Sequence, residues 1–350
     1  MQSFSLVTGA TGFLGSQLVR TLLARGESVK ALVRPGSNLA ALQGLPTDRF
    51  KIAVGDIRIE HSVFAALSGC SRMYHLAANF KMWDANPARI VAPAIEGMRA
   101  TLNAAKHRKL EKVVVTSTAG VLGTTVGPEP MDETHEFNLR DPEAYFAAKV
   151  AADQVVNEFR AAGLPVVTVL PATTAGPGDW KPTPNGRILL EYLKTPSTSH
   201  FPVTGGGINV VDVEDVANGH VLAMERGGLG ERFVLGGENL TFSQLFETLC
   251  DLTGLAEPSA PKSKALMTLA GTLLELNARF RGGEPRITSR IARDYADSYS
   301  WLSSAKAETA LGYTHRPARE ALARSVRWFL ANGYLSTKAA GRVRLELRPV

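Results

Sequence analysis

The residues with the clearest chemical potential are Tyr145 and Lys149, which lie four positions apart in a segment of strong helix propensity. Side chains four positions apart share one face of a helix, so both would point into the same crevice. An isolated phenol has a pKa of about 10, and a neighbouring ammonium group stabilises the phenolate and lowers that pKa. A phenol tuned in this way can donate a proton to a carbonyl oxygen or accept one in the reverse reaction.

A pair of hydroxyl groups, on Ser117 and Thr118, directly follows the apolar run 112–116, which predicts a β-strand. In an open α/β fold, ligands bind at the carboxyl ends of the parallel strands. We therefore expect one of these two hydroxyl groups to hydrogen-bond a substrate oxygen beside Tyr145.

The start of the chain has the pattern of a dinucleotide-binding loop: an apolar strand at 4–7, then Thr-Gly-Ala-Thr-Gly-Phe-Leu-Gly, then a helix-forming run. Gly9 can take the tight turn, Gly12 lets the backbone approach a pyrophosphate, and Gly15 lets the helix pack close to the sheet. The free N–H groups of the first helical turn would face the phosphates. Glycines kept for turn geometry alone are the alternative, and the strand that follows at 28–33 favours the dinucleotide.

The end of that second strand indicates which dinucleotide binds. Enzymes that prefer NAD place a carboxylate there for the ribose 2′-hydroxyl, whereas here Arg34 follows with no carboxylate in reach. A guanidinium offers a fork of donors suited to a 2′-phosphate, so the sequence favours NADP(H) over NAD(H), with an exposed surface arginine as the alternative. After the third strand, Asp56 can accept a hydrogen bond from an adenine amino group.

The glycine loop, the strand that ends in hydroxyl groups and the Tyr-x-x-x-Lys helix together resemble the extended branch of the short-chain dehydrogenase/reductase superfamily. The resemblance implies that Tyr145 is the general acid/base and that Lys149 holds the nicotinamide ribose and tunes Tyr145. It also implies that Thr118, rather than Ser117, binds the substrate oxygen. The expected cofactor-binding residues, from the pattern and the resemblance together, are Gly9, Thr11, Gly12, Phe13, Leu14, Gly15, Arg34, Asp56, Ile57, Leu76, Ala77, Ala78, Tyr145, Lys149, Pro171, Thr173 and Thr174.

Three further places distinguish branches of that superfamily. Nucleotide-sugar enzymes usually carry Arg-Pro where this chain has Leu170-Pro171, and an arginine where it has Ile208, so a diphosphate would lack a charge-assisted contact. The segment from Pro93 to Met98 resembles dihydroflavonol 4-reductases and cinnamoyl-CoA reductases. Over nearly its whole length the chain also resembles bacterial dihydroflavonol-reductase-like proteins, some of which are labelled hopanoid-associated sugar epimerases.

These resemblances imply an NADPH-dependent reductase that acts on a ketone or aldehyde of a medium-sized apolar or aromatic substrate. An NAD(P)-dependent sugar epimerase or dehydratase and a non-catalytic cofactor-binding protein are the alternatives.

The order of predicted elements indicates an α/β protein with a doubly wound, Rossmann-type parallel sheet and a smaller C-terminal substrate-binding part. Residues 1–170 would form the NADP-binding domain, 171–335 mainly the substrate-binding part with some segments returning to the first domain, and 336–350 a basic tail. The strands are expected at 4–7, 28–33, 50–54, 73–76, 112–116 and 166–170, and the helices near 12–25, 61–68, 87–108 and 143–162.

Composition narrows the class of protein. The hydrophobic content of 45%, the charged content of 21% and the net charge of +6 are those of an ordinary globular protein without a nucleic-acid-binding stripe. Two distant cysteines fit a reducing compartment, and neither a signal peptide nor a membrane span is recognisable, so we expect a cytoplasmic protein. The seven histidines show no metal-ligand spacing, so no metal site is expected.

Helical segments indicate two kinds of contact. The predicted helices 87–108 and 143–162 have apolar residues on more than one face, which favours a homodimer through them, although burial within one chain would give the same pattern. The apolar segment 265–276 predicts a helix that covers the substrate pocket; a lipid-facing helix with peripheral membrane contact is the alternative. Trp83, Trp180 and Phe201 could wall the pocket.

Overall fold

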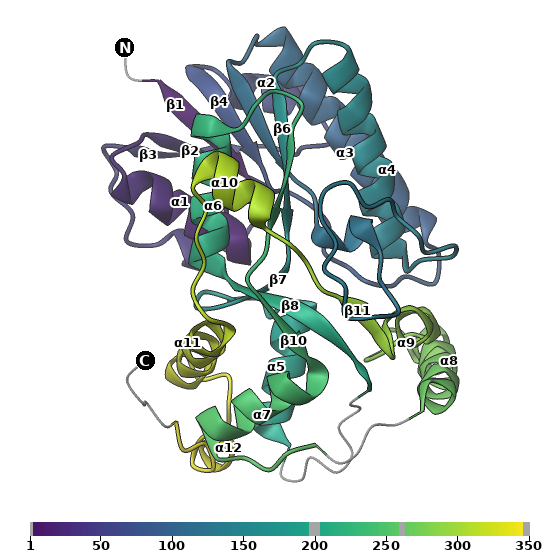
Figure 1. Cartoon of the computed structure of the whole chain (residues 1–350). Coiled ribbons are helices and arrows are strands. Elements are labelled where there is room, and N and C mark those ends of the chain that lie inside the picture. The colour runs from purple at the N-terminus through teal and green to yellow at the C-terminus, as the bar shows by residue number, and fades with distance from the viewer. Residues whose placement is uncertain (1–2, 196–203, 259–262, 346–350) are drawn as a thin grey trace.

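The computed structural model describes residues 3–195, 204–258 and 263–345, in one large and one small sheet with their helices (Figure 1). The expectations for Phe201 and for the end of the basic tail, including Arg348, lie outside the described residues.

The large sheet has seven parallel strands in the order β3-β2-β1-β4-β5-β6-β9. The six strands expected in the first half are all present, and the seventh comes from later in the chain. Their bounds are β1 Phe4–Thr8, β2 Val29–Val33, β3 Phe50–Val54, β4 Cys70–His75, β5 Lys112–Thr116, β6 Val166–Pro171 and β9 Arg232–Leu235.

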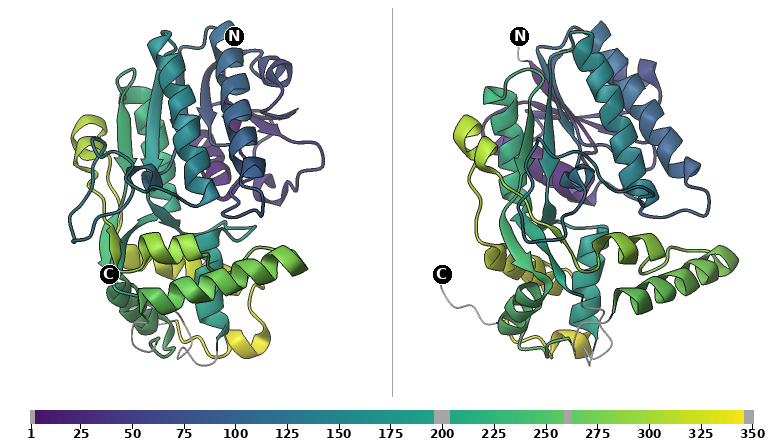
Figure 2. Two further views of the ribbon diagram at one scale, coloured as in Figure 1. Left: turned by 90° about the vertical axis from the view of Figure 1, so that its right-hand side faces the viewer. Right: turned by 45° about the vertical axis from the view of Figure 1, so that its right-hand side comes forward.

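Helices cover both faces of this sheet, which confirms the doubly wound architecture (Figures 1 and 2). One apolar cluster joins the strands to α1 and α6, with α10 beside them, and a second joins them to α2, α3 and α4. The bounds are α1 Phe13–Ala24, α6 Val213–Arg226 and α10 Ala305–Leu311 on one face, and α2 Glu60–Ala66, α3 Ala88–His107 and α4 Ala144–Ala161 on the other.

Burial on both faces explains why the central strands read as continuous apolar runs. In β5, Val113, Val114 and Val115 are fully buried because successive side chains face opposite helix layers. At the sheet edge, β3 leaves Ile52 and Val54 exposed. Because all strands of the large sheet are parallel, their carboxyl ends lie at one edge of the sheet, where the predicted catalytic residues meet.

A smaller mixed sheet follows. Its strands β7, β10 and β11 all flank β8: β7 and β11 run parallel to β8 and β10 antiparallel. The bounds are β7 Thr173–Ala175, β8 Gly206–Asp212, β10 Glu238–Thr241 and β11 Ser298–Ser300, with helices α5 Pro184–Lys194, α7 Phe242–Thr253, α8 Lys264–Arg281, α9 Ser289–Tyr295, α11 Ala318–Ala331 and α12 Thr337–Ala340 and with 3₁₀ turns at Ala40–Leu42 and Ala119–Leu122. The helix α6 packs against the large sheet, and β9 is one of its strands. The second half of the chain therefore contributes to both sheets.

The described part of the expected basic tail is folded rather than free. Ala339 is buried, the Arg342 guanidinium donates to the Lys194 carbonyl at 2.8 Å, and the Arg344 N–H donates to the Thr253 carbonyl at 2.7 Å. The segment up to residue 345 thus packs against the ends of α5 and α7. Within the three described ranges, no helix combines the length and apolarity needed to cross a membrane.

Candidate functional site

The glycine loop lies where β1 ends and α1 begins, and its glycines allow two very close backbone approaches. Gly9 has φ +71°, and a Cβ there would lie 2.8 Å from the Ala77 nitrogen. A Cβ on Gly15 would lie 2.1 Å from the Gly9 carbonyl oxygen, so only glycine lets α1 start this close to the strand. Gly9 is thereby brought beside Leu76 and Ala77, which follow β4, and Gly15 is brought beside Gly9.

The start of α1 is free to bind an anion. Gly12 caps the helix without a side-chain hydrogen bond, so no capping side chain occupies the N–H groups of the first turn. These N–H groups and the positive end of the helix dipole suit a pyrophosphate. The shape and donors of the loop therefore fit the phosphate part of a dinucleotide.

Charged groups after β2 and β3 surround the place expected for the adenosine end. Arg34 is exposed directly after β2. The Arg58 guanidinium binds both carboxylate oxygens of Asp56, with Nη2 donating to Oδ2 at 2.7 Å, and holds the pKa of Asp56 below its usual value; Arg34 acts in the same direction. Sequence reasoning missed Arg58, whose signal was its position two residues after the predicted adenine ligand.

The three expected catalytic residues meet at the carboxyl end of β5. Thr118 precedes the 3₁₀ turn and its hydroxyl accepts a hydrogen bond from the Gly120 N–H at 3.2 Å. The same hydroxyl acts on the phenol of Tyr145, the second residue of α4, and lowers its pKa. One turn further along α4, the Lys149 ammonium donates to the Thr116 carbonyl at 3.1 Å. Of the two candidate hydroxyl groups, that of Thr118 is therefore the one that acts on Tyr145.

The electrostatics of the trio differ from the simple expectation that Lys149 lowers the pKa of Tyr145. Burial raises the pKa of Tyr145 above its usual range, and the hydrogen bond with Thr118 only partly offsets this effect. Burial also lowers the pKa of Lys149, against which the Asp153 carboxylate acts. The ammonium points to a backbone carbonyl instead of the phenol, so the chain alone does not supply the expected tuning.

Two buried histidines support the strand ends that hold these groups. His75 Nδ1 lies 2.9 Å from Thr8 Oγ1, which accepts a hydrogen bond from the Ala77 N–H at 3.1 Å. His220 Nδ1 lies 2.8 Å from the Val216 carbonyl and Nε2 lies 2.8 Å from the Thr116 hydroxyl. Because a carbonyl only accepts, Nδ1 of His220 carries the proton and Nε2 accepts from the hydroxyl. Burial lowers the pKa of His75 to about 3 and that of His220 to about 4, so both are neutral.

Aromatic rings wall the site on the side of Tyr145. The Phe80 and Tyr145 ring centroids lie 4.8 Å apart, and Phe80 remains 42% exposed. Phe146 follows at 5.3 Å from Tyr145 and stacks on Tyr295 of α9 at 5.4 Å. The Tyr295 hydroxyl is buried and has no hydrogen-bond partner among the described residues. Neither Phe80 nor Tyr295 was expected from the sequence.

The other expected residues have varied surroundings. Pro171 ends β6, and Thr173 and Thr174 begin the adjoining β7, where the Thr174 hydroxyl donates to the Ala172 carbonyl at 3.1 Å. Ile57 contacts α3, because a Cβ on Gly97 would lie 3.1 Å from its Cδ1 atom. Of the expected wall residues, Trp83 is buried, and Trp180 packs on Trp328 at 5.2 Å.

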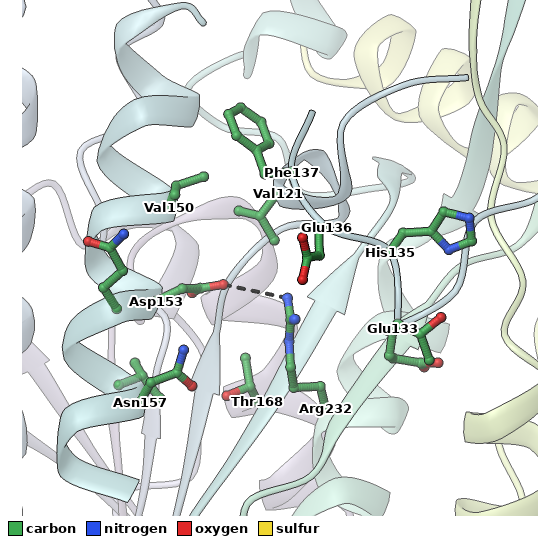
Figure 3. A pocket seen from close by; sticks show the side chains of 13 residues that line it. Val121, Glu133, His135, Glu136, Phe137, Val150, Asp153, Asn157, Thr168 and Arg232 are labelled. Atoms are coloured by element: carbon green, nitrogen blue, oxygen red, sulfur yellow. Dashed lines mark ion pairs between the residues drawn. The ribbon is translucent and has the colours of Figure 1, made fainter. Parts of the chain in front are cut away.

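A cavity of about 530 Å³ lies further along α4 and does not include Tyr145 or Lys149 (Figure 3). Val150, Asp153 and Asn157 project into it from α4. The Asp153 carboxylate lies 3.7 Å from the Arg232 guanidinium, and burial raises the pKa of this carboxyl. Asp153 thus links the cavity electrostatically to Lys149. Across the described ranges, no cluster of three or more His, Cys, Asp or Glu side chains could hold a metal ion.

Comparison with known proteins decides the family. Residues 5–236 match the NAD dependent epimerase/dehydratase family. The chain belongs to this family. It is an extended short-chain dehydrogenase/reductase of the dihydroflavonol 4-reductase-like kind, as the sequence motifs indicated. Members of the epimerase/dehydratase family use NAD(P), and the loop geometry fits such a cofactor.

Similar proteins span nearly the whole chain. It is 32% identical over 340 residues to a putative dihydroflavonol 4-reductase of Synechocystis sp., covering 95% of this chain and 96% of the relative. It is 33% identical to sterol demethylase protein B of Methylococcus capsulatus, covering 95% and 99%. Among solved structures, that of gox2253 superposes with a TM-score of 0.81 at 34% identity, covering 95% of this chain and all of the other.

Proposed function

We propose that the protein is an NADPH-dependent reductase of a ketone or aldehyde on a medium-sized apolar or aromatic molecule. The observation that carries the proposal is the interaction of the Thr118 hydroxyl with the Tyr145 phenol at the carboxyl end of β5. Packing alone gives no reason to hold these two hydroxyl groups together one helical turn before a lysine. An apolar substrate agrees with the Phe80 ring beside Tyr145 and with the names of two full-length relatives, which refer to a dihydroflavonol and a sterol.

The residues that would hold the cofactor are the glycine loop for the pyrophosphate, Asp56 for the adenine, and Arg34 with Arg58 for a 2′-phosphate. When bound, the nicotinamide supplies a hydride. Lys149 would bind the nicotinamide ribose, and further contacts would come from Ile57, Leu76, Ala77, Ala78, Pro171, Thr173 and Thr174. The division of the chain near residue 170 into cofactor-binding and substrate-binding parts belongs to the same proposal.

Tyr145 would donate its proton to the substrate oxygen, and Thr118 would hold that oxygen in place. Because burial raises the pKa of Tyr145, the phenol is protonated at neutral pH and ready to act as an acid. The reverse reaction needs the phenolate, which only a nearby positive charge can stabilise. Lys149 would supply that charge if its ammonium group turned from the Thr116 carbonyl toward the phenol.

The site gives no support to a sugar-diphosphate substrate. Ile208, at the position where nucleotide-sugar enzymes carry an arginine, packs with the apolar cluster of the smaller sheet. Solved epimerases and dehydratases superpose well, for example a nucleoside-diphosphate-sugar epimerase of Pseudomonas aeruginosa with a TM-score of 0.78, but at 24% identity. That likeness shows the shared fold alone.

Two experiments test the proposal in sequence. Thermal-shift titrations with NADPH, NADP, NADH and NAD should give the larger stabilisation with the phosphorylated pair, and Arg34→Ala should remove the difference. NADPH consumption with a panel of apolar and aromatic carbonyl compounds then identifies the substrate class. An equal or larger shift with NADH or NAD would contradict the cofactor assignment, and a cofactor that cannot be stripped from the protein would favour the epimerase alternative.

A homodimer through α3 and α4 remains a proposal as well. The two helices pack side by side within one chain, where Arg99 of α3 lies 2.8 Å from Glu158 of α4. Light scattering on the purified protein measures its oligomeric state directly.

A further inference from the structure

A row of large apolar side chains is exposed along α8. Leu266, Leu269, Leu273 and Leu276 are between 45% and 59% exposed, and Phe280 is 87% exposed. Their spacings of three and four residues alternate, so at about 100° per residue they fall within a sector of about 80° on one side of the helix. We call these five residues the α8 stripe. The stripe contradicts the expectation that this helix covers a pocket, because its leucines face outward.

The opposite side of α8 is firmly attached to the protein. Met267, Gly271 and Ala278 are buried, and a Cβ on Gly271 would lie 2.5 Å from the Ser289 nitrogen of α9. The Glu275 carboxylate accepts from the Ser289 N–H at 2.6 Å and from its hydroxyl at 2.9 Å. The outward direction of the stripe is therefore fixed by packing on the other face. In Figure 2, α8 lies below α9, and in the right-hand view it extends beyond the rest of the molecule.

α9 is tied in turn to the start of the catalytic helix. The Thr288 hydroxyl donates to the buried Glu143 carboxylate that caps α4, and the Arg290 guanidinium donates to Asp141 at 3.0 Å. The pair α8–α9 thus holds its position relative to Tyr145.

The charges beside the stripe are positive. Arg279 and Arg281 are exposed and lie about 90–110° to either side of the stripe's centre. The carboxylate within α8, Glu275, is engaged by Ser289, and Glu284 after the helix pairs with Arg187 at 3.1 Å. An apolar stripe between cations is the pattern of a helix that lies in the interface of an anionic membrane.

The alternating spacing is also that of a coiled-coil seam, so a second copy of this chain is the competing occupant. Coiled coils select their partner through opposite charges at the positions that flank the seam. Here those positions hold Ala265, Ala270, Thr272, Asn277 and Arg279, which offer one cation and no anion. Pairing α8 with itself would create no complementary ion pair, whereas an anionic surface complements both arginines.

We propose that the α8 stripe docks the protein peripherally on membranes that contain anionic lipids. The helix lies flat: its leucines and Phe280 enter the apolar layer, and Arg279 and Arg281 contact lipid phosphates. This docking does not depend on the reaction. One consequence does rest on the proposed function, because α9 and Tyr295 would place the aromatic wall of the candidate site near the bilayer surface, where apolar molecules accumulate.

The test is flotation of the full-length protein with vesicles of phosphatidylcholine alone and of phosphatidylcholine mixed equally with phosphatidylglycerol. The wild type should bind the mixed vesicles more tightly, and added salt should weaken this binding. Leu273→Ser with Phe280→Ser should weaken it about tenfold or more, because two large side chains no longer enter the apolar layer. Arg279→Glu with Arg281→Glu should weaken binding to the mixed vesicles only.

A matched control removes exposed apolar residues elsewhere. Val126 is 91% and Leu229 is 64% exposed, and replacing both by serine should leave binding unchanged. Equal binding by the wild type and the Leu273/Phe280 variant would overturn the proposal, as would no wild-type binding to the mixed vesicles. Light scattering on the same proteins detects the competing occupant: dissociation of an oligomer in the stripe variant, with lipid binding unchanged, would assign the stripe to self-association. Because flotation needs no turnover, its outcome is separate from that of the activity assays.

Discussion

Acidification should destabilise this protein through His75 and His220. Both imidazoles are buried, with 2% and 0% of their surface exposed, and burial holds their pKa values at about 3 and about 4 against an ordinary value of 6.5. Below about pH 6.5 the unfolded chain therefore binds two protons that the folded chain does not bind. The stability that the neutral histidines provide is complete above pH 6.5 and is lost as the pH falls toward their folded pKa values.

The size of the effect follows from this difference. About pH 5.5 is one unit below the pKa of a histidine in the unfolded chain. Protonation there lowers the free energy of unfolding by about 1.4 kcal/mol for each histidine, or by about 3 kcal/mol for the two. Because both rings are fully buried, solvent does not screen this effect appreciably. Some buried carboxyl groups act in the opposite direction: burial raises the pKa of Asp212 to about 7 and that of Asp179 to about 6.

The carboxyl contribution is removed by comparing variants. His75→Asn keeps an amide near the place of Nδ1, and His220→Gln keeps one near the place of Nε2, and neither titrates. Urea unfolding of the wild type and of the double variant at about pH 7.5 and about pH 5.5 gives the four free energies of unfolding. The wild type should lose about 3 kcal/mol more than the double variant between the two pH values. An equal loss in both proteins would show that His75 and His220 do not cause the acid sensitivity.

Three further substitutions test individual contacts. Gly15→Ala places a methyl group 2.1 Å from the Gly9 carbonyl oxygen, so calorimetry should show cofactor binding weakened at least about tenfold. Gly127→Ala is the control, because its Cβ would meet no atom nearer than 3.8 Å and should leave the affinity unchanged. Equal affinities of the two variants would show that the close approach at Gly15 does not matter for binding. The Asp153 carboxylate raises the pKa of Lys149, so Asp153→Asn should lower that pKa and move the alkaline limb of the kcat–pH profile to lower pH. An unmoved limb would show that Asp153 does not act on Lys149 during turnover. Tyr295→Phe deletes a buried hydroxyl without a described protein partner, so Tm should stay constant or rise in a thermal melt. A lower Tm would show that the hydroxyl makes a stabilising contact.

The sequence predicted the large sheet well because its strands are buried on both faces. A short run such as 112–116, with buried valines at its centre and segments of helical periodicity on either side, predicts a buried strand. All six expected strands are present. Tyr145 and Lys149 were recognisable because their spacing fixes one helix face, and the structure brings both to the end of β5 beside Thr118. Local pattern was sufficient for these elements.

Features that depend on contacts between distant segments could not be predicted. Nothing near Tyr295 in the sequence indicates that its ring stacks on Phe146, next to Tyr145. Likewise, the direction of the Lys149 ammonium depends on which carbonyl the fold presents to it. The leucines of α8 read as a buried face because amphipathic periodicity shows that a helix has an apolar side but not what that side contacts.

In the proposed carbonyl reduction with NADPH, Tyr145 donates the proton to the substrate oxygen. The most direct test compares the wild type with Tyr145→Phe, using the best carbonyl compound from the panel and measuring kcat together with the Kd for NADPH. We expect kcat to fall by about 10²–10⁴-fold and the Kd for NADPH to stay unchanged, because the ring and its packing remain and only the proton donor is lost. Undiminished turnover in Tyr145→Phe, with the cofactor bound normally, would contradict this role of Tyr145.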